Sequence, residues 1–525
     1  MPADEPRELP MLIRSELGDD GVLLATIEMP GRSMNVFSVA LMDALEALLD
    51  DVEATPDVRS VVLTSGKSSF LAGADLAMVR GFTEPGPADT AEVMFKRCGR
   101  LGRLFLRVED STKPWVAAVN GTALGGGLEL AMACRERLVV DDARALIGLP
   151  EVRWGLLPGA GGTQRLPRLA GFEQGLSMLL TGRAITPRHA AERGIFSRAL
   201  PAPELLAEAR AVARELQGRS PDQAAKYLHH AQTDVPVHSD EQARRIARAH
   251  GVSDPDFERY PAYSAIIDSV LLGARKDLAE ATDIEMRQFL RLMFDPVAGN
   301  MVRTLFLNRQ RADRELAAPR DLRIERITLG PLSTTRRAWR EAIEKSKLAH
   351  ASDAALSADT AQIVDSQGRS YLVALRTLDD AGGEEFFDVT AAVLSPAGPY
   401  GRAMEIVATD DAVAQALAAL ANGLGALPYR TRAARSALLR LAAATGDNPL
   451  DALALSAFDL AADGMVDDTE LFDVAACAAG IAPAFSGGPF TRLWQERSRL
   501  TARLQGPEAE TWRALEHRLG PSYPS

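Results

Sequence analysis

The sequence predicts an α/β protein built from several domains, and three observations support this prediction. Over the first third of the chain, short apolar runs typical of buried strands alternate with segments of helical periodicity. Later segments carry helical periodicity over long stretches. The length of 525 residues is more than one hydrophobic core usually serves, and 46% hydrophobic with 25% charged residues is the composition of a soluble globular chain.

Apolar patterns predict the first elements in chain order. Residues 11–13 and 22–29 indicate the two strands of a hairpin. Residues 36–53 carry leucines at helical spacing and predict a helix, and residues 60–64 (SVVLT) predict a buried strand. Residues 90–108 predict one long helix, which leads through a short turn into the most informative part of the sequence.

That part, residues 113–169, contains two glycine clusters. The apolar run 115–119 predicts a strand, and the glycine triplet 125–127 precedes a helical pattern over 128–134. The first N–H groups of a helix lack internal partners and carry partial positive charge. Such a helix start can hold an anion, or a carbonyl oxygen that becomes one.

Two glutamates lie near these glycines. Glu129 follows Gly126 by three residues, and Glu151 stands at the end of a strand predicted over 146–148. A carboxylate near such backbone donors can move a proton while the backbone stabilises a negative oxygen. The alternative for Glu129 is a solvated partner of the helix dipole, which is the commoner role of a glutamate in a first helical turn.

Several classes of function are disfavoured. The dinucleotide fingerprint fails, because Leu130 and Gln164 stand where its last glycine would be, and no phosphate-loop motif of the NTPase type occurs. The net charge of −12 argues against nucleic acid as the main partner. No run of 18 apolar residues exists, so we expect no membrane span.

The cysteines and the first residues predict a cytoplasmic protein. The three cysteines, Cys98, Cys134 and Cys477, lie far apart in sequence, as expected of reduced, buried thiols. The opening residues MPADEPREL are acidic and lack an apolar segment, so we expect neither a signal nor a transit peptide.

Three motifs resemble the enoyl-CoA hydratase (crotonase) superfamily. They are SSFLAGADLAMV at 68–79, GTALGGGLELAMAC at 121–134 and GLPEVRWGLLPGAGGTQRLPRLAG at 148–171. The sequence is most similar to the hydratase half of the multifunctional fatty-acid oxidation alpha subunit. This resemblance implies a core of ββα turns arranged as a spiral over residues 1–200.

The resemblance also implies the roles of individual residues. The two amides of the oxyanion hole fall on Ala74 and Gly126, and the catalytic glutamates fall on Glu129 and Glu151. Glu151 would donate a proton to the alpha carbon of the substrate, and Glu129 would hold and activate a water. No metal or NAD is expected, and CoA enters only as part of the acyl-CoA substrate. The expected substrate-binding positions are Ala72, Gly73, Asp75, Gly125, Pro150 and Gly159.

Residues 201–320 are expected to form a helical extension and linker. Helices are predicted over 203–216, 260–275 and 278–310, and the last two resemble the segment that joins the halves of the multifunctional alpha subunit. Four of the seven histidines lie between the first two of these helices. Their irregular spacing favours structural or solvated roles over a metal site. They are His229, His230, His238 and His250.

Residues 321–425 are expected to form a truncated, degenerate dinucleotide-binding-like (Rossmann-like) domain. A strand predicted at 323–329 is followed by GPLSTT, which has one glycine and a proline and is a poor cradle for a pyrophosphate. By resemblance to the dehydrogenase, Ala392 takes the place of its catalytic histidine. Glu405 matches the glutamate that would pair with that histidine, and Ser436 falls roughly at an asparagine position.

Residues 426–525 are expected to form an all-helical domain that resembles the C-terminal domain of the same dehydrogenase. Its most specific piece, GGPF at 487–490, is predicted to be a structural turn between helices, and an amphipathic helix is predicted over 501–519.

The sequence therefore predicts a hydro-lyase that converts 2-trans-enoyl-CoA to 3-hydroxyacyl-CoA, as in fatty-acid β-oxidation, with an inactive dehydrogenase half. Δ3,Δ2-enoyl-CoA isomerisation or other crotonase chemistry is the alternative. An alternative of another class is a non-catalytic assembly subunit that docks a thiolase-like partner. A homo-oligomer is expected.

Overall fold

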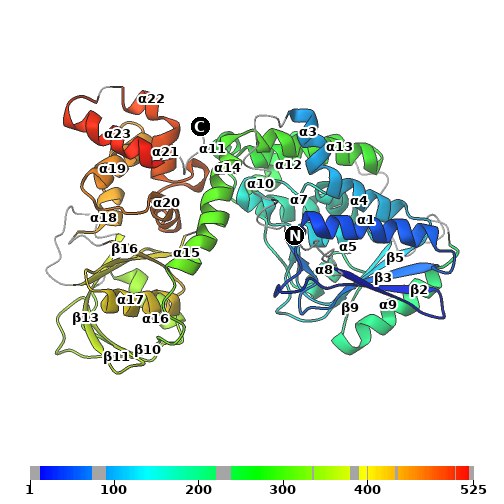
Figure 1. The fold of residues 1–525 in the computed structure, drawn as a ribbon, viewed down its shortest axis with the longest axis horizontal. Coiled ribbons are helices and arrows are strands. Elements are labelled where there is room, and N and C mark those ends of the chain that lie inside the picture. Colours follow the sequence, from blue (N-terminus) through cyan, green and yellow to red (C-terminus); the bar gives the residue numbers. More distant parts are fainter. Residues whose placement is uncertain are drawn as a thin grey trace, which may run out of the picture. The chain divides into compact units, whose positions relative to one another are not determined.

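The computed structural model divides the chain into two compact units, Met1–Gly299 and Asn300–Ser525 (Figure 1). The structure describes residues 12–73, 78, 90–219, 238–333, 336–378, 390–398, 400–431, 435–502 and 504–519. The finer division into four parts at residues 200, 320 and 425 stays a prediction. Among the described residues, no helix combines the length and the apolar character that crossing a bilayer requires.

The first unit contains a six-stranded sheet in the order β1-β2-β3-β5-β7-β9. The β1–β2 pair is an antiparallel hairpin, as predicted, although its first strand begins where the predicted strand 11–13 ends, and the remaining neighbours pair in parallel. Parallel neighbouring strands have to be joined by crossover connections, and in this sheet those connections contain helices. The strands are β1 (Ile13–Leu17), β2 (Val22–Ile27), β3 (Ser60–Ser65), β5 (Trp115–Val119), β7 (Glu136–Val140) and β9 (Arg198–Leu200).

A second, smaller parallel sheet is made of three two-residue strands in the order β4-β6-β8. These are β4 (Leu71–Ala72), β6 (Ala123–Leu124) and β8 (Ile147–Gly148), which follow β3, β5 and β7 in the chain. Each pass of the chain thus adds one strand to the large sheet and one to the small sheet. This repeat agrees with the spiral of ββα turns that the sequence predicts.

Helices cover both faces of the large sheet (Figure 1). Helix α9 packs on one face, against alternate residues of β3, β5 and β7 such as Val62, Val116 and Leu138. Most of the other helices of this unit share a core with the opposite face. They include α1 (Val39–Ala54), α3 (Ala91–Cys98), α4 (Arg100–Asp110), α5 (Gly126–Ala133), α6 (Gly162–Ala170), α7 (Phe172–Thr181), α8 (Pro187–Glu192), α10 (Asp240–Ala249), α11 (Asp254–Arg259), α12 (Pro261–Gly273) and α13 (Leu278–Met293), while α9 spans Ala202–Leu216.

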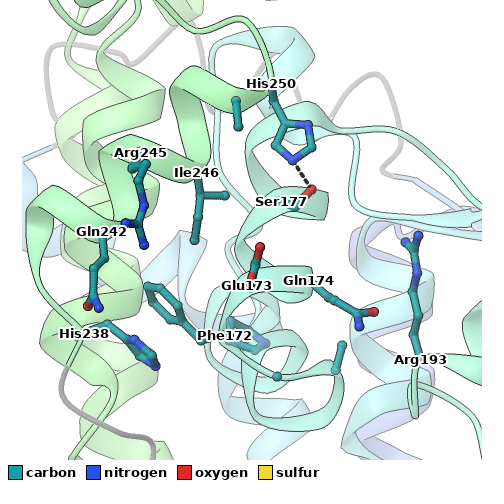
Figure 2. Close-up of a pocket in the computed structure, with 14 residues that line it drawn as sticks. Phe172, Glu173, Gln174, Ser177, Arg193, His238, Gln242, Arg245, Ile246 and His250 are labelled. Atoms are coloured by element: carbon teal, nitrogen blue, oxygen red, sulfur yellow. Dashed lines mark hydrogen bonds between the residues drawn. The ribbon is translucent and has the colours of Figure 1, made fainter.

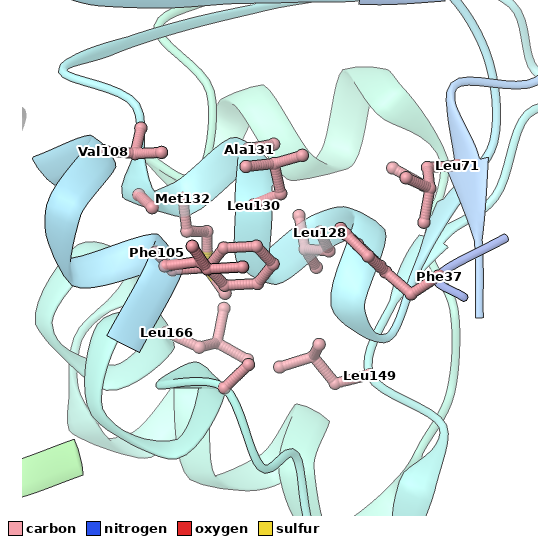
Figure 3. Packing of buried hydrophobic residues seen from close by; sticks show 14 of the residues in the cluster. Phe37, Leu71, Phe105, Val108, Leu128, Leu130, Ala131, Met132, Leu149 and Leu166 are labelled. Carbon is pink, nitrogen blue, oxygen red and sulfur yellow. The ribbon is translucent and has the colours of Figure 1, made fainter. Parts of the chain in front are cut away.

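Helix α5 is the centre of this core. Gly127 through Ala133 are all buried, as expected of a helix that is apolar on every side. Figure 3 shows Leu128 and Leu130 of α5 among the neighbouring side chains, including Phe37 and Phe105, whose rings meet edge to face at 5.5 Å. Any charged group carried by α5 therefore lies in a low-dielectric surrounding.

Two predicted helices are interrupted. The segment 90–108 forms α3 and α4, which meet at Gly99, a residue with low helix propensity. The segment 278–310 breaks at Asp295, because the proline that follows disfavours the helical conformation of its predecessor. Beyond it come α14 (Pro296–Met301), the π-helical segment η3 (Val302–Asn308) and α15 (Arg309–Glu315).

The second unit contains a seven-stranded sheet in the order β11-β10-β12-β13-β14-β15-β16. Three of the six described strand pairs are antiparallel, whereas a dinucleotide-binding sheet is mostly parallel. The expected α/β composition is present, and the strand directions differ from a doubly wound fold. The strands are β10 (Ile324–Leu329), β11 (His350–Ser352), β12 (Thr360–Asp365), β13 (Ser370–Thr377), β14 (Ala391–Leu394), β15 (Ala403–Val407) and β16 (Leu427–Thr431).

The rest of the second unit is helical. Helices α16 (Arg337–Lys345) and α17 (Asp411–Gly423) share a core with the sheet. The all-helical C-terminal part follows β16, and its predicted last helix is confined to α23. Its helices are α18 (Ala437–Ala442), α19 (Pro449–Ala462), α20 (Thr469–Ala478), α21 (Pro489–Gln495), α22 (Arg497–Leu500) and α23 (Pro507–Leu519).

The GGPF motif forms the turn into α21. Gly487 and Gly488 have φ values of 76° and 109°, which favour glycine. Asp473 of α20 accepts hydrogen bonds from the amides of Phe490 and Thr491 at 2.8 and 2.9 Å. These contacts give the motif a packing role.

Candidate active site

The small sheet brings the three sequence motifs to one place. Its parallel strands β4 and β6 lead directly to Gly73 and Gly125, and β8 leads through Leu149 to Pro150. Backbone bonds continue across these ends, since Gly73 donates to Leu124 O at 3.1 Å and Gly125 donates to Gly148 O at 3.0 Å. The carboxyl ends of parallel strands meet at one edge, which is where open α/β sheets place their ligands.

Glu129 is buried within α5, with 3% of its surface exposed. Its Oε1 accepts hydrogen bonds from the amides of Ala160 and Gly162, both at 2.8 Å. Burial raises the pKa of Glu129, and these two amides and the charge of Arg165 act in the opposite direction. Glu129 is therefore a carboxylate whose ionised form is supported by fixed donors.

Glu151 begins the short 3-10 helix η1 (Glu151–Trp154). Its Oε2 is buried and has no hydrogen-bond partner among the described residues. Burial, and next the negative charge of Glu129, raise the pKa of Glu151 well above its ordinary value. The two carboxyls thus differ in environment, because two amides hold Glu129 whereas Oε2 of Glu151 has no partner among the described residues.

Gly125 makes the approach of Glu151 possible. A Cβ at residue 125 would lie 2.7 Å from Oε1 of Glu151 and 3.9 Å from the Cα of Gly73. Its φ of 54° is also one that side chains rarely adopt. One residue from each of the three motifs therefore meets at this point.

The amide of Gly126 is the first of α5 and has no acceptor among the described residues. It is available to a carbonyl oxygen, and its assignment as an oxyanion donor stays a prediction. The other predicted donor, Ala74, and the predicted substrate residue Asp75 lie outside the described residues. Their neighbour Gly73 is fixed on both sides, because its carbonyl also accepts from Phe37 N at 3.0 Å.

The remaining predicted substrate residues are Ala72, Pro150 and Gly159, and their substrate role stays a prediction. Ala72 lies in β4 and donates its amide to Asn35 O at 3.0 Å. Pro150 immediately precedes η1. Gly159 packs on Phe289 of α13, whose ring would lie 3.0 Å from a Cβ at residue 159.

Two charged residues near Glu129 and Glu151 were not predicted from the sequence. Arg165 of α6 is 3% exposed, donates to Ala160 O at 2.9 Å and pairs with Glu109 at 2.9 Å. Glu285 of α13 is fully buried, and burial raises its pKa to about 8. The sequence contained a signal for Glu285, because it lies four residues from both Ala281 and Phe289, on the apolar stripe of its helix.

The histidines in the described part do not form a metal site. His238 stacks on Phe172 with ring centroids 3.6 Å apart, and His250 Nε2 lies 2.6 Å from Ser177 Oγ (Figure 2). Both line a cavity of about 1000 Å³ beside α7 and α10. No group of three His, Cys, Asp or Glu side chains suited to a metal occurs among the described residues, and His229 and His230 lie outside them.

In the second unit, Glu405 of β15 is fully buried and bound at the start of α18. It accepts from the Thr431 hydroxyl at 2.6 Å and from the amides of Ala437 and Leu438 at 2.8 and 3.2 Å. The Ser436 hydroxyl also donates to it. Glu405 therefore serves as a helix cap.

The other predicted dehydrogenase positions in this unit are apolar or packed. Ala392 is fully buried in β14. A Cβ at Gly330 would lie 2.2 Å from Ser357 O, so this loop packs closely against backbone. The last two residues of GPLSTT lie outside the described residues.

Comparison with known proteins places the N-terminal part of the chain in a family. The family model described as Enoyl-CoA hydratase/isomerase matches residues 18–252. This part of the chain belongs to the crotonase superfamily.

Within that superfamily, the chain is a distant homologue of the fatty acid oxidation complex subunit alpha. The protein of that name from Idiomarina loihiensis is 37% identical over 292 residues, which are 54% of this chain and 39% of that protein. The one from Shewanella baltica (strain OS155) is 35% identical over 280 residues, 52% of this chain and 38% of that protein. The chain thus spans less than half the length of these relatives. An enoyl-CoA hydratase structure from Bacillus anthracis is 28% identical with a TM-score of 0.37, covering 48% of this chain and 96% of that one.

Proposed function

We propose that the first unit hydrates 2-trans-enoyl-CoA to 3-hydroxyacyl-CoA. The observation that carries the proposal is the pair Glu129 and Glu151, two carboxyls in unlike environments that interact at the edge where the three motifs meet. A hydration needs one base and one acid, and such a pair supplies both.

In this proposal, Glu129 is the base. Its Oε1 accepts from two amides, and no donor among the described residues binds Oε2, which leaves that oxygen for a water. As the water oxygen bonds to the beta carbon, its proton passes to Glu129. Glu151, protonated because its pKa is raised, gives its proton to the alpha carbon. Proton exchange with solvent then restores both carboxyls.

The thioester oxygen gains negative charge during this addition. The amide of Gly126, free among the described residues, would stabilise that charge, together with the amide proposed at Ala74. One such donor contributes on the order of 10²–10³ in rate, and positioned acid–base groups contribute about 10²–10⁴.

The presence of two glutamates favours hydration over isomerisation, which needs only one to move a proton between carbons. The proposed test supplies crotonyl-CoA to the purified protein and follows loss of the conjugated enoyl absorbance. A 3-enoyl-CoA supplied in parallel measures isomerisation. Loss of crotonyl-CoA signal is expected, and no reaction with short or long enoyl-CoA would overturn the proposal.

We further propose that the second unit has no dehydrogenase activity. Support comes from Ala392, which offers no proton acceptor, and from Glu405, whose oxygens are occupied as a helix cap. NAD added after hydration should give no NADH. A role in docking a thiolase-like subunit remains compatible with this, and native mass measurement with such a partner would test it.

A further inference from the structure

The start of α6 holds two buried carboxyls at once. Four consecutive amides, those of residues 160–163, donate alternately to Glu129 and to Glu285. The four donor–acceptor distances are Ala160 to Glu129 at 2.8 Å, Gly161 to Glu285 at 2.6 Å, Gly162 to Glu129 at 2.8 Å, and Thr163 to Glu285 at 2.9 Å.

Glycines make this alternation possible. Gly161 has a φ of 97°, in the region that favours glycine. A Cβ at residue 162 would lie 2.8 Å from Oε1 of Glu129. The loop therefore fits between the two carboxyls only with these residues.

Glu285 is further held by hydroxyls. The Thr163 hydroxyl donates to its Oε2 at 2.5 Å and lies 2.7 Å from Ser269 Oγ of α12. Because the Thr163–Ser269 bond can run in either direction, these hydroxyls can serve Glu285 in both its ionised and its protonated form.

We propose that Glu285 is a positioning residue for the acid–base pair: it fixes the amides that hold Glu129 and sets a third ionisable group against Glu129 and Glu151. This inference rests on the proposed hydration. Glu285 lies outside the part of the chain that the family model matches, because α13 begins beyond residue 252.

The charged groups around Glu285 decide the direction of its effect. Those that interact with it are Glu129 of α5, Glu151 of η1 and Arg168 of α6. Helix α12 faces it with the Ser269 hydroxyl, and α6 also carries the buried Arg165, whose charge acts on Glu129 and Arg168. Among the described residues, no charged side chain of α3 or α4 contacts Glu285. Of the three groups that interact with Glu285, Arg168 is a cation and the two glutamates are carboxyls, and ionised Glu285 opposes loss of the proton from Glu151.

The consequence is a one-sided effect on the pH profile. Below about pH 8 Glu285 is mostly protonated and neutral. A neutral replacement therefore leaves the acid limb, the rise of kcat on the acid side of the pH profile, unchanged. Above that pH its negative charge opposes loss of the proton from Glu151, so we expect a neutral replacement to move the fall of kcat on the alkaline side to lower pH.

The test measures kcat and KM for crotonyl-CoA from pH 5 to 10 in the full-length protein. Glu285→Gln removes the charge. Glu285→Asp keeps the charge and shortens its reach to the amides. Asp283→Asn, an exposed carboxylate on the same helix, is the matched control. Circular dichroism establishes that each variant is folded.

With Glu285→Gln we expect the alkaline limb of kcat to move to lower pH while KM changes less than twofold. With Glu285→Asp we expect kcat to fall about tenfold, while the alkaline limb of the pH profile stays close to its wild-type pH. The control should match wild type.

The role of Glu285 would be overturned if the folded Glu285→Gln variant kept the wild-type pH profile. It would also be overturned if Glu285→Asp kept the wild-type kcat. Should the Gln variant not fold, the Asp variant still decides the positioning role. An inactive wild-type enzyme would instead reject the hydratase assignment, so the two failures are distinct.

Discussion

Oxygen Oε1 of Glu151 occupies space that a side chain at Gly125 would need, 2.7 Å from the position of its Cβ. Glu151 can therefore approach the start of α5 this closely only because residue 125 has no Cβ. The same glycine has a φ of 54°, so the match is made in a conformation that other residues adopt at a cost.

Gly125→Ala should displace Glu151 and strain the backbone. We expect hydration to fall by 100-fold or more, on the order of one lost oxyanion or acid–base contribution. Stability should fall by about 1–3 kcal/mol, measured by denaturant unfolding. Gly31→Ala is the control, because its φ is 71° and nothing lies within 4 Å of its Cβ position. Equal activity losses in the two variants would show that strain alone, and not the contact with Glu151, is responsible.

Glu151→Gln should lower kcat for crotonyl-CoA by about 10²–10⁴ and leave the fold intact. The carboxyl has a buried oxygen without a described partner, so its replacement by a neutral amide removes no hydrogen bond from that oxygen. We expect an unchanged or higher Tm by calorimetry. Glu192→Gln, at an exposed position on α8, should keep full activity. Near-wild-type turnover by Glu151→Gln would contradict its role as the acid.

The stability of the first unit should depend on pH through Glu285. Its pKa is near 4.5 in an unfolded chain and is raised to about 8 by burial in the folded protein. The protonated form therefore favours folding, and this contribution is complete below pH 4.5 and lost as pH rises toward 8. The Glu285→Gln variant cannot lose this pH-dependent contribution to stability. The difference between its Tm and that of the wild type should therefore increase from pH 5 to pH 8. A constant difference across that range would show that Glu285 does not titrate there.

Glu405→Ala should destabilise the second unit and spare hydration. The substitution leaves two hydroxyls and two amides without their buried acceptor, which costs about 3 kcal/mol. Calorimetry should show a lower Tm, while crotonyl-CoA turnover stays at the wild-type value. Glu325→Ala, on the exposed side of β10, should change neither. An unaltered Tm in Glu405→Ala would mean that the cap contributes little.

The parts of the site that lie within continuous motifs could be predicted from sequence. Gly126 and Glu129 are separated by less than one helical turn, and Glu151 follows a strand end, so local patterns and the family resemblance indicated all three. The contact between Gly125 and Glu151 could not be predicted without the small sheet, whose two-residue strands carry almost no periodic signal.

Glu285 was missed for a different reason. It bonds to residues more than 120 positions earlier, and hydrophobic periodicity reports which face of a helix is buried without naming what it meets. A glutamate on an apolar stripe was visible in the sequence, and its meaning needed the packing of α13 on α6.

The fold of the first unit was predicted well because its strands and helices alternate clearly. The helix breaks at Gly99 and before Pro296 went unpredicted, since apolar spacing continues across both. The strand directions of the second unit also could not be predicted, because a short apolar run has the same pattern in parallel and antiparallel sheets.

The alternating amides at residues 160–163 connect the part of the chain that the family model matches, residues 18–252, to a residue beyond it. Glu129, before residue 252, and Glu285, beyond it, are held by alternate N–H groups of the same four-residue segment, two to each carboxyl. Engineering that transplants only residues 18–252 would leave Gly161 and Thr163 without their acceptor. If the proposed role of Glu285 holds, a functional transplant has to extend through α13.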